Sequence, residues 1–197
     1  MDALSLPLSN HMLLVVGTRA VSDAMLDLTA RMALRKPSGV CSIRVVDGGN
    51  LFNAYEVARA ICRQMTAQAE ASQGPGYGDL SMDGALRRIH LSRAFTCYQM
   101  VTLLEGTPLD ATPTCLLDLL SSFYDEAVRL EESQRLLQVC LAAIRRLSDQ
   151  APVIVSIRPV EPRHADRACL FESLQAAAGQ VWEQKVIPAP LPPQPWW

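Results

Sequence analysis

The stretch HMLLVVGT (11–18), followed closely by SDAMLDLTARMALR (22–35), decides the fold class. The first piece is a continuous apolar run that ends in glycine, which predicts a buried β-strand. In the second piece apolar residues recur at helical spacing, and the Ser-Asp pair at its start can cap a helix. A buried strand followed by a helix is the repeating unit of an α/β protein.

The same alternation continues along the chain. Further strands are expected at 40–49, 87–94, 114–120, 151–159 and 180–187, and helices at 52–70, 96–105, 124–149 and 166–178. Residues 72–84 are rich in Gly, Ser and Asp, which predicts a loop. Because the strands are apolar throughout, we expect an α/β fold with a mostly parallel sheet and helices on both faces. The predicted organisation is an N-terminal tail (1–10), one domain (11–187) and a Pro-rich tail (188–197).

The composition narrows the class of protein. The chain has 197 residues, of which 49% are hydrophobic and 19% charged, enough apolar material for one sizeable core and too much for a disordered protein. The net charge of −2 provides no overall basic field for nucleic acid, although a local basic patch remains open. No apolar run reaches the roughly 20 residues that span a membrane. The first residues, MDALSLPLSN, lack the basic start of a secretory signal peptide. We expect a cytoplasmic protein, or a nuclear one in a eukaryote.

The thiols and imidazoles do not predict a metal site. No two of the six cysteines have the spacing of a zinc site, and most lie in apolar stretches, so we expect free buried thiols in a reducing compartment. The three histidines form no local metal-binding or nucleophile arrangement, and we expect ordinary surface or core residues. They are His11, His90 and His164.

Ligands of parallel sheets bind at the carboxyl ends of the strands, so the residues after each strand are the candidates. A phosphate-binding loop after the first strand would run from Gly17 to position 24 and would hold glycine, lysine and Ser or Thr at its last three positions. This chain has Ser22, Asp23 and Ala24 there. Asp23 would repel a triphosphate, whereas Arg19 could still touch an anion. The alternative is a plain turn and helix cap.

Two acidic residues follow later strands. Asp47 ends the second apolar run and precedes Gly49, and Asp118 follows Cys115-Leu116-Leu117. An aspartate in the position of Asp118, after a mostly apolar strand core, holds magnesium in nucleotide-binding sheets. A strand-end aspartate can equally cap a turn, and the sequence leaves both interpretations open.

Four segments, in order, carry a family pattern: VDGGNLF (46–52), IHLSRAFTCYQ (89–99), LLD (116–118) and VIVSIR (153–158). Together they resemble the ATPase core of the RecA/RadA recombinase family over roughly residues 11–160. The second is similar to the family's strand ending in Ala-Arg-Ala-Phe/Tyr with a Gln a few residues on, and the third to its Walker B strand. The resemblance implies a RecA-like P-loop NTPase fold.

The chain departs from that family at the positions that carry its chemistry. Asp23 occupies the Walker A lysine position, and Gly49 that of the glutamate that activates the attacking water. Loss of the phosphate-binding cation and of the base removes what phosphoryl transfer depends on. We therefore expect a degenerate nucleotide site (Gly17, Arg19, Ser22, Asp23, Ala24, Asp47, Gly49 and Asp118), no catalytic residues, no metal and no cofactor, with ATP–magnesium disfavoured.

The resemblance also suggests what such a protein does. Degenerate members of the family assist a recombinase, so we expect a protein partner, either a RecA/RadA-type recombinase or a second copy. Single-stranded DNA is a further expected partner, and the candidate contacts are Arg158, Arg163, His164 and Arg167 in the loop after the 151–159 strand. The alternative for this loop is a solvated surface, because acidic residues are interleaved.

Two other functions remain open from the sequence. One is a nucleotide-binding enzyme in which Arg19, Asp47 and Asp118 rebuild a phosphate and metal site. The other is a scaffold with no role on DNA.

Overall fold

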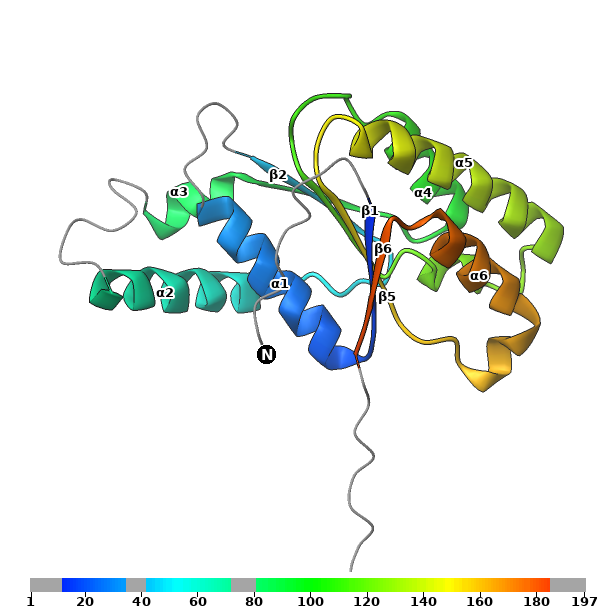
Figure 1. Cartoon of the computed structure of the whole chain (residues 1–197), viewed down its shortest axis with the longest axis horizontal. Helices are drawn as coiled ribbons and strands as arrows, with labels where there is room; N and C mark the ends of the chain where they lie inside the picture. Colours follow the sequence, from blue (N-terminus) through cyan, green and yellow to red (C-terminus); the bar gives the residue numbers. More distant parts are fainter. Residues whose placement is uncertain (1–11, 35–41, 72–80, 185–197) are drawn as a thin grey trace, which may run out of the picture.

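The computed structural model describes residues 12–34, 42–71 and 81–184, which form one sheet between two groups of helices (Figure 1). The strands are β1 (Met12–Val16), β2 (Ile43–Asp47), β3 (Ile89–Arg93), β4 (Thr114–Leu117), β5 (Val153–Ile157) and β6 (Gln180–Glu183). The helices are α1 (Arg19–Leu34), α2 (Ala54–Ala71), α3 (Met82–Arg87), α4 (Cys97–Glu105), α5 (Leu130–Ser148) and α6 (Ala168–Ala177), with 3-10 turns at Ser121–Phe123 and Pro162–Arg167. The predicted tails, 1–10 and 188–197, and His11 lie outside the described residues.

The strands form a sheet in the order β3-β2-β4-β5-β1-β6. All of its strand pairs are parallel; in the centre, for example, Met12 of β1 is in register with Val153 of β5, which in turn pairs with Thr114 of β4. The predicted α/β class and parallel sheet are therefore confirmed. All the strands point the same way, so the loops that follow them meet at one edge of the sheet.

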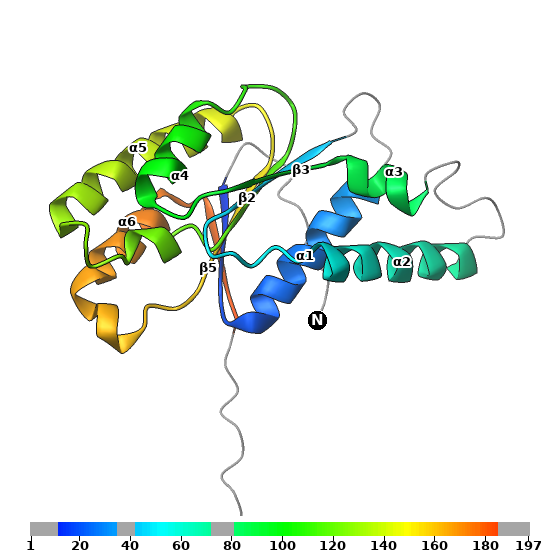
Figure 2. The same cartoon turned by 180° about the vertical axis from the view of Figure 1, so that it is seen from behind.

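The helices cover both faces because the chain reverses its direction across the sheet. From β1 to β3 it moves one way through α1, α2 and α3, and from β3 to β6 it moves back through α4, α5 and α6. Right-handed crossovers in opposite directions place their helices on opposite faces. Figures 1 and 2 show these two groups on either side of the strands. The connections from the neighbouring strands β2 and β4 leave toward opposite faces, which opens a crevice where parallel sheets bind ligands.

The hydrophobic core has two parts, one on each face of the sheet. Successive side chains of a strand point to opposite faces. Leu13 and Val15 of β1 accordingly pack in the cluster with α1 and α2, whereas Leu14 and Val16 pack in the cluster with α4, α5 and α6. Strands buried on both faces explain why the sequence shows uninterrupted apolar runs.

The boundaries of several elements differ from the prediction. α1 begins at Arg19 rather than at residue 22, directly after a turn of two residues. The predicted loop 72–84 contains the start of α3, where the Ser81 side chain accepts a hydrogen bond from the Gly84 amide at 3.1 Å. The predicted strand 114–120 ends at Leu117, because Asp118 adopts a left-handed backbone conformation (φ 50°) that a strand does not allow.

The predicted long helix 124–149 is also shorter than expected. It begins at Leu130, and residues 124–129 form an irregular segment after β4. In that segment the Asp125 carboxylate accepts a hydrogen bond from the Ala127 amide at 2.9 Å, a turn that competes with helix formation. Residues assigned by sequence to a helix thus lie at the edge where ligands bind. Within the described ranges, no helix has the length and apolar character needed to cross a bilayer.

The cysteines in the described part of the chain are free thiols, as expected. Cys97, Cys115 and Cys140 are buried, whereas Cys62 is exposed and Cys169 is half-buried; Cys41 lies outside the described residues. Burial raises the pKa of the Cys115 thiol, and likewise that of Cys140, to about 12 from an ordinary value of 9.0. The neutral thiol is therefore the form that the folded state accommodates.

This burial predicts a loss of stability in alkali. Between pH 9 and 12 the unfolded chain releases the thiol protons while the folded protein keeps them. The contribution of the buried thiols to the free energy of unfolding is therefore fully present below pH 9 and falls as the pH rises toward 12. At pH 10.5 we expect a loss of about 2 kcal/mol per thiol in the free energy of unfolding, measured by urea denaturation against pH 8. Cys115→Val should make this pH dependence shallower, and an unchanged dependence in the variant would contradict the assignment.

Candidate functional site

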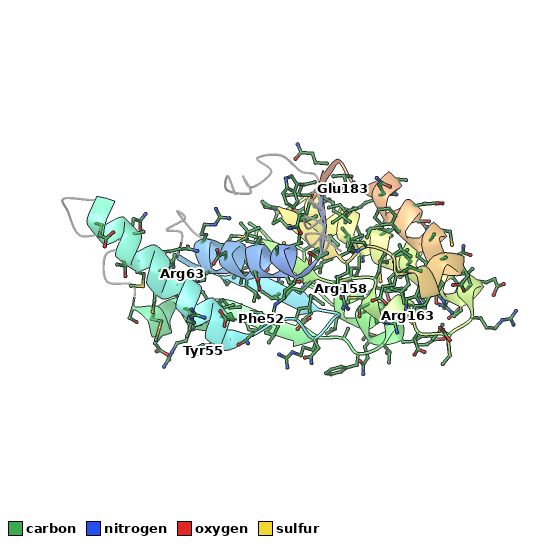
Figure 3. All side chains as sticks on the ribbon, turned by 90° about the horizontal axis from the view of Figure 1, so that it is seen from below. Phe52, Tyr55, Arg63, Arg158, Arg163 and Glu183 are labelled. Atoms are coloured by element: carbon green, nitrogen blue, oxygen red, sulfur yellow. The ribbon has the colours of Figure 1, made fainter. Side chains whose placement is uncertain are left out.

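The loops after β2, β3, β4 and β5 enclose a pocket of about 400 Å³ at the carboxyl edge of the sheet. Figure 3 looks onto this edge, with Arg158 near the middle and Arg163 toward the α5 and α6 side. The lining residues are Gly48, Gly49, Asn50, Phe95, Asp118, Ser121, Ser122, Tyr124, Asp125, Arg158, Pro159, Glu161, Arg163 and His164. The pocket thus forms where the topology predicts a ligand site.

Asp118 lies at the floor of the pocket, and an arginine neutralises it. Its side chain is 3% exposed. Its Oδ1 accepts a hydrogen bond from the Arg158 amide at 3.3 Å, and its Oδ2 accepts one from Arg158 Nε at 2.7 Å, with Nη2 at 2.5 Å. Arg158 Nη2 also donates to the Ser121 hydroxyl at 3.3 Å. The guanidinium therefore pairs with the carboxylate that was the candidate magnesium ligand in the sequence.

Two glycines give the pocket its hollow floor. The Gly48 amide donates to the Leu117 carbonyl at 2.8 Å, which holds the loop after β2 against the end of β4. A Cβ added at Gly49 would lie 2.4 Å from Asp118 Oδ2 and 2.6 Å from Asp118 Cβ. These distances are shorter than any tolerated contact, so only glycine fits here while Asp118 keeps its position. The position that the resemblance gives to a catalytic glutamate is thus closed to any side chain.

Asp47 stabilises the loop instead of lining the pocket. Its side chain is fully buried, and its two oxygens accept hydrogen bonds from the backbone amides of Leu51 and Phe52, at 2.9 and 2.8 Å. Arg93 Nε lies 3.6 Å from Oδ2. Both carboxylate oxygens are occupied by these contacts, so Asp47 fixes the turn between β2 and α2.

The predicted phosphate-loop residues lie apart from the pocket. Only Gly17 and Thr18 separate β1 from α1, so Ser22, Asp23 and Ala24 fall inside the helix. A Cβ at Gly17 would lie 2.3 Å from a Val21 methyl group and 2.9 Å from Gln184, which shows that the space over this glycine is filled. Of the eight residues in the predicted degenerate nucleotide site, Gly49 and Asp118 line the pocket, and the structure does not bring the other six to it.

The candidate DNA contacts have different environments. Arg158 and Arg163 are 48% and 70% exposed, and Arg163 Nε lies 2.8 Å from a Glu161 carboxylate oxygen. The His164 ring stacks on Tyr124 with ring centroids 5.1 Å apart and an interplanar angle of 10°. All three residues line the pocket.

Arg167 is buried and holds other parts of the chain in place. Its Nη1 donates to the Phe123 carbonyl at 2.9 Å and to the Ser133 hydroxyl at 3.1 Å, and its Nη2 donates to the Val128 carbonyl at 2.6 Å. With the residue only 5% exposed, this guanidinium is not presented to a phosphate backbone. Arg167 is therefore excluded from the candidate DNA contacts and has a structural role.

Several residues that line the pocket were not among the candidates predicted from the sequence. Ser121, Ser122, Tyr124 and Asp125 follow β4 directly, and the rule that ligands bind after strands would have found them. The prediction instead assigned 114–120 to a strand and 124–149 to a helix. Burial is the main cause that raises the pKa of the Tyr124 hydroxyl from 10.0 to about 12, and the nearby Asp118 carboxylate is a second cause.

The charged groups of the pocket are largely paired with one another. Arg158 pairs with Asp118, and Arg163 with Glu161. Across residues 12–34, 42–71 and 81–184, no three His, Cys, Asp or Glu side chains gather where they could hold a metal ion. The pocket therefore offers hydrogen-bonding groups and aromatic rings rather than a strong cation or a metal.

No family model matches this chain, and no curated protein matches it.

Proposed function

We propose that this chain is a RecA-like protein that does not catalyse phosphoryl transfer and acts as an accessory factor in DNA recombination or repair. It would work through a protein partner, either a RecA/RadA-type recombinase or a second copy, and through single-stranded DNA. The six-stranded parallel sheet with helices on both faces is compatible with a RecA-like fold. The P-loop character of that fold is part of the proposal.

The junction between β1 and α1 is the observation that carries the proposal. A phosphate-binding loop needs room for the phosphates over its glycines and a cation beside them. Here the space over Gly17 is filled by Val21 and Gln184, and the lysine position is Asp23. These features favour an accessory role over an ATPase.

The rival nucleotide-binding enzyme has less support. It requires Arg19, Asp47 and Asp118 to act on one ligand. Arg19 and Asp47 do not line the pocket, the oxygens of Asp47 bind backbone amides, and Asp118 is paired with Arg158. The scaffold without a DNA role becomes an outcome of the experiment below.

The DNA part of the proposal rests on Arg158 and Arg163. Both are substantially exposed at the rim of the pocket, and both belong to the loop after β5. Two cations on one loop can neutralise about two phosphates of a strand that crosses the pocket mouth, and each contact to a single strand contributes about 0.7 to the logarithmic salt dependence of binding.

We therefore expect the Arg158→Ala/Arg163→Ala double variant to bind a fluorescent single strand about tenfold more weakly at low salt, as measured by anisotropy, with a shallower salt dependence. Arg145→Ala/Arg146→Ala is the matched control, because it removes the same charge from exposed positions at the C-terminal end of α5. Arg163→Ala alone adds a variant that leaves the buried Asp118 with its partner. Loss of affinity in the control pair to the same extent, or no binding by the wild type, would reject the DNA role and favour the scaffold.

A further inference from the structure

Three residues that line the pocket at the carboxyl edge each have a buried polar atom without a hydrogen-bond partner. Seven buried side-chain nitrogen or oxygen atoms in the described residues have no hydrogen-bond partner, and three of these belong to residues that line the pocket. They are Ser122 Oγ, Tyr124 Oη and His164 Nδ1. A buried polar group without a partner costs about 1–3 kcal/mol, so a cluster of three points to a partner supplied from outside the chain.

An exposed aromatic ring lies on the opposite side of the same pocket. Phe95 is 69% exposed, although its backbone is held in place: its amide donates to the Gln99 side chain at 2.8 Å, and the neighbouring Ala94 amide donates to the Asp47 carbonyl at 3.0 Å. Thr96 also caps α4 at this point. The ring is therefore exposed on a fixed turn, and an exposed aromatic face beside a pocket is a surface on which a flat ring can stack.

The sheet order sets the distance between the two sides. Phe95 follows β3, whereas Tyr124 follows β4 and His164 follows β5, and β2 lies between β3 and β4. Neighbouring strands are about 4.8 Å apart, so about 14 Å separates the outer strands of this group. Gly48 and Gly49 contribute no side chains to the floor between them. The volume of about 400 Å³ is in the range of small-molecule pockets.

The charges of the lining residues disfavour a triphosphate inside the pocket, whereas the exposed guanidiniums at its rim remain open to the phosphates of a strand. Three carboxylates line the pocket, Asp118, Asp125 and Glu161, against two guanidiniums, and each guanidinium is paired with a carboxylate. Asp125 has no cationic partner in the described part of the chain. A ligand that donates hydrogen bonds from an amino group matches this balance, whereas a triphosphate would be repelled.

We propose that this pocket binds an uncharged nitrogen heterocycle with an amino group, of the type found in cytosine and adenine. The ring stacks on Phe95, its polar edge meets the hydroxyls and imidazole of Ser122, Tyr124 and His164, and its amino group faces the carboxylates. This site is separate from the β1–α1 junction, and it goes beyond the proposed role on DNA.

Cytidine and uridine form a matched pair of probes of the same size and shape: cytidine has an amino group at C4 and a hydrogen-bond acceptor at N3, whereas uridine has a carbonyl oxygen at C4 and an N–H donor at N3. We expect isothermal titration to show binding of cytidine and of adenosine, and binding of uridine at least about tenfold weaker, since the carbonyl would face carboxylates. Inorganic tripolyphosphate with magnesium should not bind. Equal binding of cytidine and uridine, or binding of neither cytidine nor adenosine, would overturn the proposal.

Two variants connect the binding to the proposed contacts. Phe95→Ala should weaken cytidine binding about tenfold without changing the melting temperature of the free protein, because its ring is mostly solvent-exposed. Tyr55→Ala is the control, since Tyr55 is equally exposed at 69% but lies on α2 outside the pocket. Tyr124→Phe keeps the stack on His164 and should weaken binding about fivefold through loss of the hydroxyl. If Phe95→Ala binds cytidine like the Tyr55 control, the assignment of the pocket is wrong.

The outcome is independent of the DNA experiment. A failure of cytidine to bind leaves the loss of affinity in the Arg158/Arg163 variant unaffected. A failure of DNA binding likewise leaves the comparison of cytidine with uridine intact.

Discussion

Replacing Arg167 by methionine is expected to lower the free energy of unfolding by about 3 kcal/mol, measured by urea denaturation. The guanidinium donates to the Phe123 and Val128 carbonyls and to the Ser133 hydroxyl. Methionine fills much of the volume but leaves these interior acceptors without a donor, and each costs about 1–3 kcal/mol. The net loss is smaller than their sum, because burying a guanidinium also has a desolvation cost that methionine avoids.

Arg163→Met is the matched control for this prediction. Arg163 lies four residues earlier in the same loop and is 70% exposed, so its replacement should change the free energy of unfolding by less than about 0.5 kcal/mol. Equal losses in the two variants would contradict the structural role of Arg167. The prediction also explains why Arg167 is left unchanged in the DNA experiment: a variant that unfolds loses every activity.

Adding a side chain at Gly49 is expected to destabilise the protein by about 2 kcal/mol for alanine, with a larger loss for glutamate. The new Cβ would meet Asp118 Oδ2 at 2.4 Å and Asp118 Cβ at 2.6 Å. Asp118 cannot readily move away, because Arg158 binds both of its carboxylate oxygens. Restoring the glutamate that the RecA/RadA resemblance places here should therefore give a less stable protein without ATP hydrolysis.

A double-mutant cycle identifies the cause. Asp118→Gly removes both atoms that the new Cβ meets and suits the left-handed backbone at that position (φ 50°). The loss caused by Gly49→Ala should then be at least about 1 kcal/mol smaller in the Asp118→Gly background. Gly106→Ala is the control. Its added Cβ would lie 3.2 Å from its nearest neighbour, the Thr102 carbonyl oxygen, and the backbone at Gly106 is helical. Additive losses at positions 49 and 118 would show that the steric explanation is wrong.

The fold could be predicted from the sequence because its signals are local. Continuous apolar runs such as LLVV in β1 and VIV in β5 are buried on both faces, and few arrangements other than a parallel sheet achieve this. The end of β4 could not be predicted from the sequence, because it depends on the positive φ of Asp118, which its residue type does not predict.

The site was harder to predict because its properties depend on contacts between distant segments. Arg158, Arg163 and Arg167 look alike in the sequence, yet the first binds a buried carboxylate, the second is exposed and the third is buried. Arg167 differs from the other two because its guanidinium contacts the carbonyls of Phe123 and Val128, which lie some forty residues away in the sequence. Asp47 was a candidate ligand residue for the same reason: only the structure shows that two backbone amides occupy its carboxylate.

The central claim, that the β1–α1 junction does not bind a triphosphate, is tested most directly by thermal melts with millimolar ATP–magnesium and with adenosine at the same concentration. A ligand that binds the folded state raises the melting temperature by mass action. We predict that ATP–magnesium raises the melting temperature no more than adenosine does. A rise of several degrees beyond that of adenosine would contradict the account; its loss in Asp118→Ala would assign the nucleotide site to the end of β4, and its persistence would assign it to the β1–α1 junction.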